Sequence, residues 1–255
     1  MSAPEIQYFS STDGTRLAWR EMGAGHPLIL IHGFISDATT NWITYGTAAQ
    51  LVDAGYRCIM PDLRAHGSSD RPHDPASYPL DILADDQFAL IEHLGLVDYD
   101  LAGYSLGART AARLLARGAK PGRAVISGMG LAGLTNTAAR SAHFHNILRN
   151  IGHHQKGSPE WMAEAFLKTT GGDPVALDLI LDTFIDTPHD VLAGLERPIG
   201  VVCGAQDQDN GSAAALADAL PQGELITIPG NHMSAVTKRE FGAALVGFLQ
   251  SSGGQ

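Results

Sequence analysis

The chain has 255 residues, enough for one large α/β domain with a substantial core. Hydrophobic residues make up 44% and charged residues 17% of the chain, an ordinary globular composition. The net charge of −10 argues against a nucleic-acid partner, which would need a basic face, and mildly against an anionic membrane surface.

The first half of the chain alternates segments that favour strands with segments that favour helices. Residues 6–10 and 16–20 flank an Asp13-Gly14 turn and predict a β-hairpin. A continuous apolar run over 28–31 is typical of a strand buried on both faces. The other segments continue the alternation: a helix over 47–54, a strand over 56–60, a helix over 80–94, a strand over 99–102, a helix over 108–115 and a strand over 124–127.

Residues 128–197 have a different pattern, with no convincing strand. Amphipathic helices are predicted there over 141–150, 159–169 and 174–185. The alternation then resumes with a strand over 199–203, a helix over 212–220, a strand over 225–228 and a helix over 239–250. We predict a mostly parallel, doubly wound sheet with an antiparallel hairpin at its edge. Residues 1–127 and 198–255 form the predicted core domain, and 128–197 form a helical cap over the edge where α/β proteins bind ligands.

The motif Gly103-Tyr104-Ser105-Leu106-Gly107 lies between a predicted strand and a predicted helix. This is the nucleophile-elbow pattern. The turn is too tight for side chains at its flanks, so glycine is needed on both sides. The serine is held in a strained conformation with its hydroxyl exposed above the sheet. Ser105 is therefore the candidate nucleophile.

A serine hydroxyl needs a neighbouring base to take its proton, and the base needs a carboxylate to hold it. His232 directly follows the last predicted strand, and Asp207 directly follows the strand before it. The order Ser, acid, His is the one that this fold requires, and both loops leave the same edge of the sheet as Ser105. A second acid, Asp209, is interpreted as a solvated loop residue or a helix N-cap.

Two further motifs carry a family resemblance. Ile31-His32-Gly33-Phe34 resembles the His-Gly oxyanion loop of the α/β-hydrolase superfamily, and the run from Asp62 to Ser69 resembles its Asp-x-Arg-x-x-Gly-x-Ser stretch. Over essentially its full length, the chain resembles the serine-nucleophile branch of this superfamily. Asp207 also matches the Gly-x-x-Asp spacing of the family.

The resemblance implies roles for the matched residues. Ser105 would attack an acyl carbon, His232 would accept and return the proton, and Asp207 would fix the tautomer of the histidine. The oxyanion donors would be the backbone N–H groups of Leu106 and Phe34. His32 is expected to shape the oxyanion loop, and Asp62, Arg64 and His66 are expected to brace the site as a structural turn.

The predicted function is a cofactor-free serine hydrolase that cleaves a small ester or lactone. Other functions use the same triad: a C–C hydrolase of β-diketones from aromatic-ring degradation (the meta-cleavage-product type), a thioesterase, an amidase or a perhydrolase. A C–C hydrolase would need cap groups for a dienoate carboxylate, which Arg140, Arg149, His143 and His145 could supply. A ligand receptor or signalling protein with slow turnover is a third possibility. Epoxide hydrolases and dehalogenases of this fold carry aspartate at the elbow, and Ser105 sets them aside.

Some apolar cap residues should face Ser105, because the elbow needs a lid above it. The predicted pocket residues are His32, Gly33, Tyr104, His143, Trp161, Phe184 and Met233, with Phe34 beside them. A histidine cluster in the cap, at 143, 145, 153 and 154, lacks the carboxylate or cysteine pattern that would complete a metal site. We therefore predict no metal.

The remaining features concern location. Cys58 and Cys203 lie in predicted strands and are expected to be buried, reduced thiols. Residues 1–10 contain no basic segment followed by an apolar one, and no apolar stretch is long enough to span a bilayer. We expect a cytoplasmic protein whose partner is a small acyl substrate, without nucleic acid or membrane. The sequence does not indicate an oligomeric state.

Overall fold

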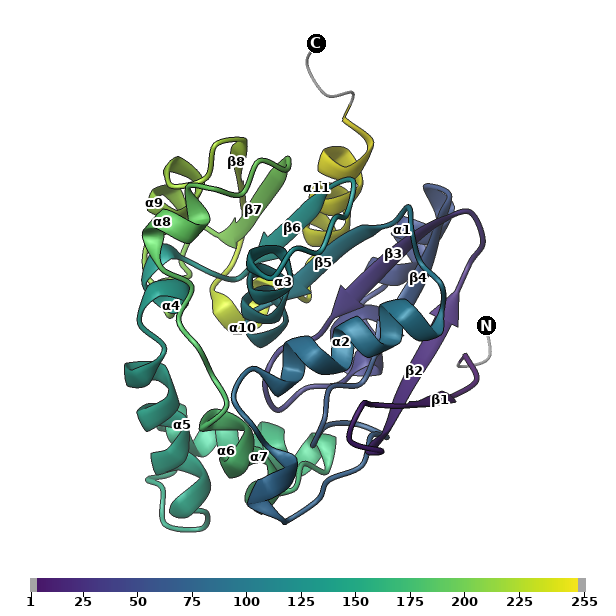
Figure 1. Cartoon of the computed structure of the whole chain (residues 1–255). Helices are drawn as coiled ribbons and strands as arrows, with labels where there is room; N and C mark the ends of the chain where they lie inside the picture. The colour runs from purple at the N-terminus through teal and green to yellow at the C-terminus, as the bar shows by residue number, and fades with distance from the viewer. Residues whose placement is uncertain (1–3, 252–255) are drawn as a thin grey trace.

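A mixed sheet of eight strands, in the order β1-β2-β4-β3-β5-β6-β7-β8, runs through the molecule (Figure 1). The computed structural model describes residues 4–251. Residues 1–3 and 252–255, the two ends of the predicted core domain, lie outside the described residues. The strands are β1 (Gln7–Ser10), β2 (Arg16–Met22), β3 (His26–Ile31), β4 (Tyr56–Pro61), β5 (Asp100–Tyr104), β6 (Ala124–Ser127), β7 (Ile199–Gly204) and β8 (Gly223–Ile228).

Strand pairing confirms the predicted α/β class. β1 and β2 form the antiparallel hairpin, and β2 also pairs antiparallel with β4. All other neighbours are parallel. Side chains of a strand alternate between the two faces, so the run in β3 fills two cores. Leu28 and Leu30 pack in one core, and Ile29 and Ile31 pack in the other.

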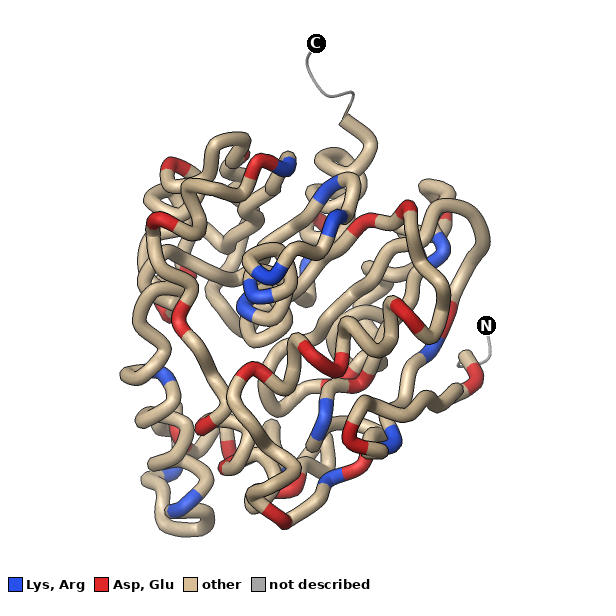
Figure 2. The backbone as a smooth tube through the Cα atoms, in the orientation of Figure 1, with Lys and Arg blue, Asp and Glu red and all other residues tan. Residues whose placement is uncertain are grey.

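Helices cover both faces of the sheet. α1 (Thr47–Asp53) and α11 (Arg239–Gln250) pack together on one face, in the core of Leu28 and Leu30. α2 (Ile82–His93), α3 (Leu106–Ala116) and α9 (Ala213–Asp218) contribute to the core of Ile29 and Ile31 on the other. Ion pairs join α3 to the start of α2, and Figure 2 shows basic residues of α3 beside acidic residues of α2.

The segment 128–197 is helical and, throughout its described length, contains no strand. Its helices are α4 (Leu131–Thr135), α5 (Ala138–Arg149), α6 (Pro159–Thr170), α7 (Pro174–Leu181) and α8 (His189–Leu192). α5 packs against α6 and α7 at one end of the molecule (Figure 1). That 128–197 folds as a separate cap stays a prediction, and "cap" is used below for these residues.

One predicted boundary in the cap was wrong. α7 ends at Leu181 and not at 185. The carbonyl of Thr183 accepts a hydrogen bond from the N–H of Asp81, and the Thr183 hydroxyl donates back to the Ile180 carbonyl. The chain therefore leaves the helix to join the core. The short helices α4 and α8 were not predicted, because so few residues show no clear periodicity.

The elbow lies where α3 crosses β3 and β5 at very short range. A Cβ atom added to Gly103 would lie 2.1 Å from the Gly107 carbonyl oxygen, and one added to Gly107 would lie 2.0 Å from the Ile31 carbonyl oxygen. Between these glycines, Ser105 has φ 53° and ψ −108°, a conformation that L-residues rarely adopt. The two glycines are therefore required by backbone contacts, not by local flexibility.

Gly107→Ala tests this contact against Gly247→Ala, because both glycines lie inside helices but only Gly107 meets backbone. We expect Gly107→Ala to lower the free energy of unfolding by about 3 kcal/mol, the upper end for overpacking. Gly247→Ala should raise it by roughly 0.5–1 kcal/mol through helix propensity. Urea denaturation measures both. Equal midpoints for Gly107→Ala and the unmodified protein would contradict the assignment.

Candidate active site

Three loops at one edge of the sheet bring Ser105, His232 and Asp207 together. Ser105 follows β5, Asp207 follows β7, and His232 follows β8. The Nε2 atom of His232 lies 3.0 Å from Ser105 Oγ, and its Nδ1 atom lies 2.8 Å from Asp207 Oδ2. His232 and Asp207 are buried, whereas Ser105 is partly exposed. The three predicted residues thus form one connected chain of hydrogen bonds.

His232 is held at the start of a short helix that was not predicted, α10 (His232–Ala235). Asn231 caps this helix: its side chain accepts from the N–H of Ser234, and the Ser234 hydroxyl accepts from the N–H of Asn231. The Tyr104 hydroxyl donates to the His232 carbonyl, so the residue before the nucleophile also positions the base. An Asn followed three residues later by a Ser was the sequence signal for this helix.

The structure distinguishes the two acids of the 207–209 loop. Asp207 accepts from His232 and, through Oδ1, from the backbone N–H of Asp209 at 3.1 Å. Burial would raise the pKa of Asp207, but the hydrogen bond and charge of His232 together hold that pKa below its ordinary value. Asp209 instead pairs with Arg140 at 3.1 Å. The N-cap of α9 is Ser212, so Asp209 is a partly exposed ion-pair partner and not a cap.

The candidate oxyanion donors border Ser105. Leu106 is the first residue of α3, where a backbone N–H has no partner within the helix. Among the hydrogen bonds of residues 4–251, neither the Leu106 N–H nor the Phe34 N–H reaches a protein acceptor. A Cβ atom on Gly33 would lie 3.6 Å from Ser105 Cβ, so the oxyanion loop runs directly past the nucleophile. Both N–H groups are free to donate to a substrate oxygen, and their role stays a prediction.

Two buried imidazoles connect the oxyanion loop to the turn after β4. His32 Nε2 accepts from the N–H of Leu63 at 2.9 Å, and His66 Nε2 accepts from the N–H of Ile35 at 3.3 Å. Each Nδ1 faces a backbone carbonyl, which assigns the proton to Nδ1 in both rings. Burial lowers the pKa of His32, and burial, followed by the repulsion that two protonated neighbouring rings would feel, lowers the pKa of His66 to about 3. Both rings are therefore neutral acceptors.

Asp62 and Arg64, in the same turn, together bind backbone N–H groups and charged side chains. Asp62 is buried and accepts from Arg20 at 2.8 Å and from the N–H groups of Ala38 and Ser68, both at 2.9 Å. Arg64 is fully buried and pairs with Asp13 and Asp86. Neither side chain lines a cavity at Ser105. Their placement supports a bracing function.

Protonation of His66 would remove the acceptor of Ile35, so folding stability should fall in acid. The ordinary pKa of 6.5 applies to the unfolded chain, so the contribution is complete above pH 6.5 and is lost as the pH falls toward 3. The loss for His66 alone is roughly 1.4 kcal/mol per pH unit. In His66→Gln the amide oxygen can still accept from the Ile35 N–H. The contribution of His66 to the slope of the free energy of unfolding against pH should therefore disappear. Urea denaturation between pH 7 and pH 4 checks it.

The exposed His153→Gln is the matched control and should leave the pH dependence of stability unchanged. An equally steep acid loss in His66→Gln and in the unmodified protein would overturn the bracing assignment.

A cavity of about 410 Å³ lies above Ser105, between the core and the cap. Of the predicted pocket residues, Gly33, Tyr104, His143 and Met233 line it, and so does Phe34. Arg140, which the sequence offered as a cap group for a substrate carboxylate, lines it as well. The cavity is also lined by residues that were not predicted: Ile35, Ser36, Asn41, Phe144, Pro159, Met162, Ala163, Phe166, Asp209, Asn231 and Val236.

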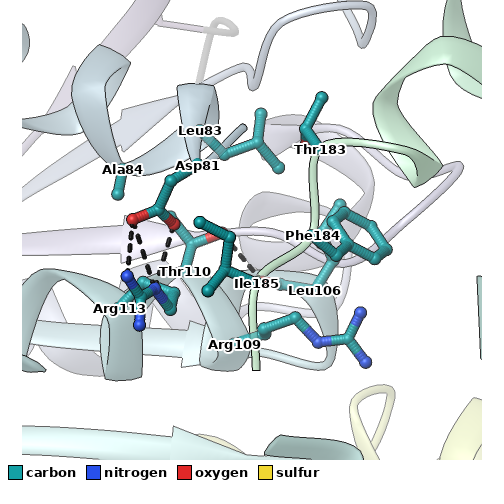
Figure 3. A pocket seen from close by; sticks show the side chains of 10 residues that line it. All are labelled: Asp81, Leu83, Ala84, Leu106, Arg109, Thr110, Arg113, Thr183, Phe184 and Ile185. Carbon is teal, nitrogen blue, oxygen red and sulfur yellow. Dashed lines mark hydrogen bonds and ion pairs between the residues drawn. The ribbon is translucent and has the colours of Figure 1, made fainter. Parts of the chain in front are cut away.

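Three predicted pocket residues do not line this cavity. His32 is fully buried behind the oxyanion loop, because its ring is used by Leu63 and Gly33. Trp161 is 37% exposed and does not line the cavity, because the face of α6 that lines it is formed by Met162, Ala163 and Phe166. Phe184 lies close to Leu106 (Figure 3). It lines a separate cavity of about 20 Å³, which Ser105 also lines.

Two of the four clustered histidines of the cap have protein partners for their rings. His145 lies between Asp178 at 2.6 Å and Asp182 at 3.1 Å, and His154 faces the Ile147 carbonyl. Among the described residues, no group of three or more His, Cys, Asp or Glu side chains is placed to hold a metal ion. Within that same range, no helix is long and apolar enough to cross a membrane. Cys58 and Cys203 are buried free thiols.

Comparison with known proteins supports the fold. A family model for the alpha/beta hydrolase fold matches residues 26–139. The non-heme chloroperoxidase CPO-A1 of Kitasatospora aureofaciens is 35% identical over 42% of this chain and 38% of its own length. The 2-hydroxymuconate semialdehyde hydrolase of Pseudomonas sp. (strain CF600) is 31% identical over 52% of this chain and 46% of its own. The chain thus spans less than half the length of these relatives.

Solved structures match nearly the whole chain at low identity. A hydrolase from Pseudomonas aeruginosa PA01 has a TM-score of 0.76 and 24% identity, and covers 98% of this chain and 100% of its own. The enol-lactonase from Burkholderia xenovorans LB400 has a TM-score of 0.74 and 20% identity, with 96% and 100% coverage. At such identities the likeness establishes the shared fold alone.

Proposed function

The chain belongs to the α/β-hydrolase fold superfamily, and on that premise we propose that it is a serine hydrolase of small carboxylic esters or lactones. The supporting observation is the hydrogen-bonded chain from Ser105 through His232 to Asp207, with separations of 3.0 and 2.8 Å. These three residues supply the nucleophile, the base and the orienting acid, and water is the second reactant. The proposed reaction therefore needs no cofactor.

In the first half-reaction, Ser105 Oγ attacks the acyl carbon while His232 Nε2 takes the hydroxyl proton. The carbonyl oxygen becomes an anion, to which the N–H groups of Leu106 and Phe34 donate. The tetrahedral intermediate collapses, the bond to the leaving oxygen breaks, and His232 returns the proton to that oxygen. Asp207 keeps the imidazole in the Nδ1–H tautomer and stabilises its charged form.

In the second half-reaction, the histidine removes a proton from water, and the resulting hydroxide attacks the acyl carbon. The acid leaves, and Ser105 recovers its proton from His232. The acyl group is bonded to Ser105 between the two half-reactions, so the cavity must hold it while the leaving group departs. A volume of about 410 Å³ suits a small substrate.

A second candidate keeps the triad and changes the bond that breaks. The 2-hydroxymuconate semialdehyde hydrolase relative favours C–C cleavage of a ring-cleavage diketone. Haloperoxidase relatives favour a perhydrolase, in which hydrogen peroxide replaces water as the second nucleophile. A comparison of rates on aryl esters, lactones and a ring-cleavage product distinguishes ester hydrolysis from C–C cleavage. A preference of many-fold for the diketone would replace the esterase proposal.

Ser105→Ala tests the nucleophile. Because no other group can form the acyl-enzyme, we expect kcat for short acyl esters to fall by about a millionfold. Labelling by an uncharged fluorophosphonate should also disappear, while circular dichroism and the unfolding midpoint stay as in the unmodified protein. A mutant that retained full activity would show that Ser105 is not the nucleophile.

Asp207→Asn tests the choice of acid, with Asp209→Asn as the matched variant two residues away. An amide at 207 would hold the imidazole in the wrong tautomer, and kcat should fall by about 10⁴-fold. Asp209→Asn leaves the contact between Asp207 and His232 in place, so it should cost far less in kcat. Steady-state kinetics on one short ester decides between them, and the reverse ranking would assign the acid to Asp209.

A further inference from the structure

Helix α3 carries Arg109, Arg113 and Arg117 at four-residue spacing, so all three lie along one side of the helix. Arg113 pairs with Asp81 at 2.8 Å, and Arg117 pairs with Asp85 at 2.6 Å. Figure 3 shows the contact between Asp81 and Arg113, with Arg109 extending away from it past Leu106. The arginine nearest to the nucleophile is therefore the one without an acidic partner on α2.

Arg109 is also the most buried of the three, at 5% exposure. Its Nε and Nη2 atoms both donate to the Gly133 carbonyl, and its guanidinium lies 4.6 Å from the ring centroid of Phe184. Within residues 4–251, no carboxylate is within ion-pair distance of it and Nη1 reaches no acceptor. Burial, and then the charge of Arg140, lowers the pKa of Arg109 to about 10, and the charge of Asp186 opposes this shift.

A buried cation without a counter-ion is costly, and one beside a reactive serine calls for an anion. Arg109 and Ser105 both line the cavity of about 20 Å³, together with Phe34, Leu106, Met129, Arg140, Phe144, Leu181, Phe184 and Asn210. A space of this size holds about one water-sized group, such as one oxygen of a carboxylate. Two guanidinium groups border it, and no acidic side chain does.

Arg140 lines both this cavity and the larger one. Its partner Asp209 has a side chain that is 44% exposed, so their ion pair is weak and open to exchange. A carboxylate entering the small cavity would meet donors from both arginines. Arg109 is the stronger anchor, because among the described residues no carboxylate lies within ion-pair distance of it and Asp186 acts on it only through its more distant charge.

We propose that Arg109 and Arg140 form an anion subsite beside Ser105, so that the substrate carries a carboxylate close to the scissile carbonyl. The proposal rests on the proposed hydrolase function. A carboxylate suits this site because the remaining Nη1 of Arg109 and the guanidinium of Arg140 can each donate a charge-assisted hydrogen bond to it. The substrate class is therefore monoesters of short dicarboxylic acids, or lactones that bear a carboxylate.

The two cavities also assign the carboxylate to the acyl part of the substrate. The leaving oxygen must receive its proton from His232, which lines the larger cavity and not the smaller. Leu106, one of the two candidate oxyanion donors, borders the smaller cavity and not the larger, whereas Phe34 borders both, so we place the smaller cavity on the acyl side of the carbonyl. The carboxylate stays bound to the arginines while the alcohol leaves through the larger cavity.

Two pairs of substrates of matched shape test the subsite. Monomethyl succinate and the neutral methyl levulinate differ at the acyl end, whereas acetoxyacetate and the neutral acetoxyacetone differ at the alcohol end. We expect kcat/KM of the unmodified protein to favour monomethyl succinate over methyl levulinate by about tenfold to a hundredfold, as for a hydrogen bond to a charged group. We expect no such preference for acetoxyacetate.

The ratio of kcat/KM within the acyl pair should fall to near one in Arg109→Met and in Arg140→Gln. Arg149→Gln is the matched control, because Arg149 lies on the same helix as Arg140, is exposed, pairs with Asp178 and lines neither cavity. It should keep the preference. If Arg109→Met does not fold, Arg140→Gln and competitive inhibition of the unmodified protein by succinate but not succinamide provide the test.

Equal rates for the acyl pair in the unmodified protein, or a preference retained in both Arg109→Met and Arg140→Gln, would overturn the proposal. A preference only within the alcohol pair would overturn the assignment to the acyl side. Labelling of Ser105 by an uncharged fluorophosphonate separates the two levels. Absence of labelling contradicts the hydrolase function itself, whereas labelling without a preference for the anionic ester contradicts the subsite alone.

Discussion

The contact between helix α3 and strand β3 is the constraint on which the site depends. The Ile31 carbonyl sits where any side chain at position 107 would be, so α3 can approach the sheet only with glycine there. That approach forces Ser105 into its positive-φ conformation and turns its hydroxyl toward His232. It also brings Gly33, at the end of β3, against the nucleophile. One backbone contact thus fixes nucleophile, base contact and oxyanion loop relative to one another.

A second set of buried polar groups holds the oxyanion loop against that fixed point. Such groups are stable only when every donor and acceptor is used. His32 and His66 meet this condition only as neutral rings, since a proton on Nε2 would face the N–H groups of Leu63 and Ile35. The Asp-x-Arg stretch is therefore bound to the loop through imidazole acceptors rather than through charge. Asp62, Arg64 and His66 line no cavity at Ser105, so they brace the site without entering its chemistry.

The sheet, the cap helices and the triad candidates could be predicted from the sequence, because each rests on a local rule. Apolar periodicity marks strands and helices, glycine marks the elbow, and parallel strands end at one edge. The pocket could not be predicted in the same way. Periodicity shows that α6 has an apolar face, but not that Met162 and Phe166 rather than Trp161 meet the cavity. Arginine side chains are mostly exposed, so the sequence does not indicate that Arg109 is buried; tertiary packing removes it from water.

The overall charge of −10 would repel an anionic substrate at long range, yet it does not oppose a local anion subsite. Salt reduces the field of exposed charges over about 8–10 Å at physiological ionic strength, whereas a buried group is screened far less. Asp81 and Asp85, at the start of α2, offset Arg113 and Arg117, whereas Arg109, the arginine beside Ser105, has no carboxylate within ion-pair distance among the described residues. An anion that reaches the cavity is therefore governed by the nearest guanidinium groups and not by the net charge. Selectivity for a carboxylate would then depend on desolvation at the site, and little on steering from solution.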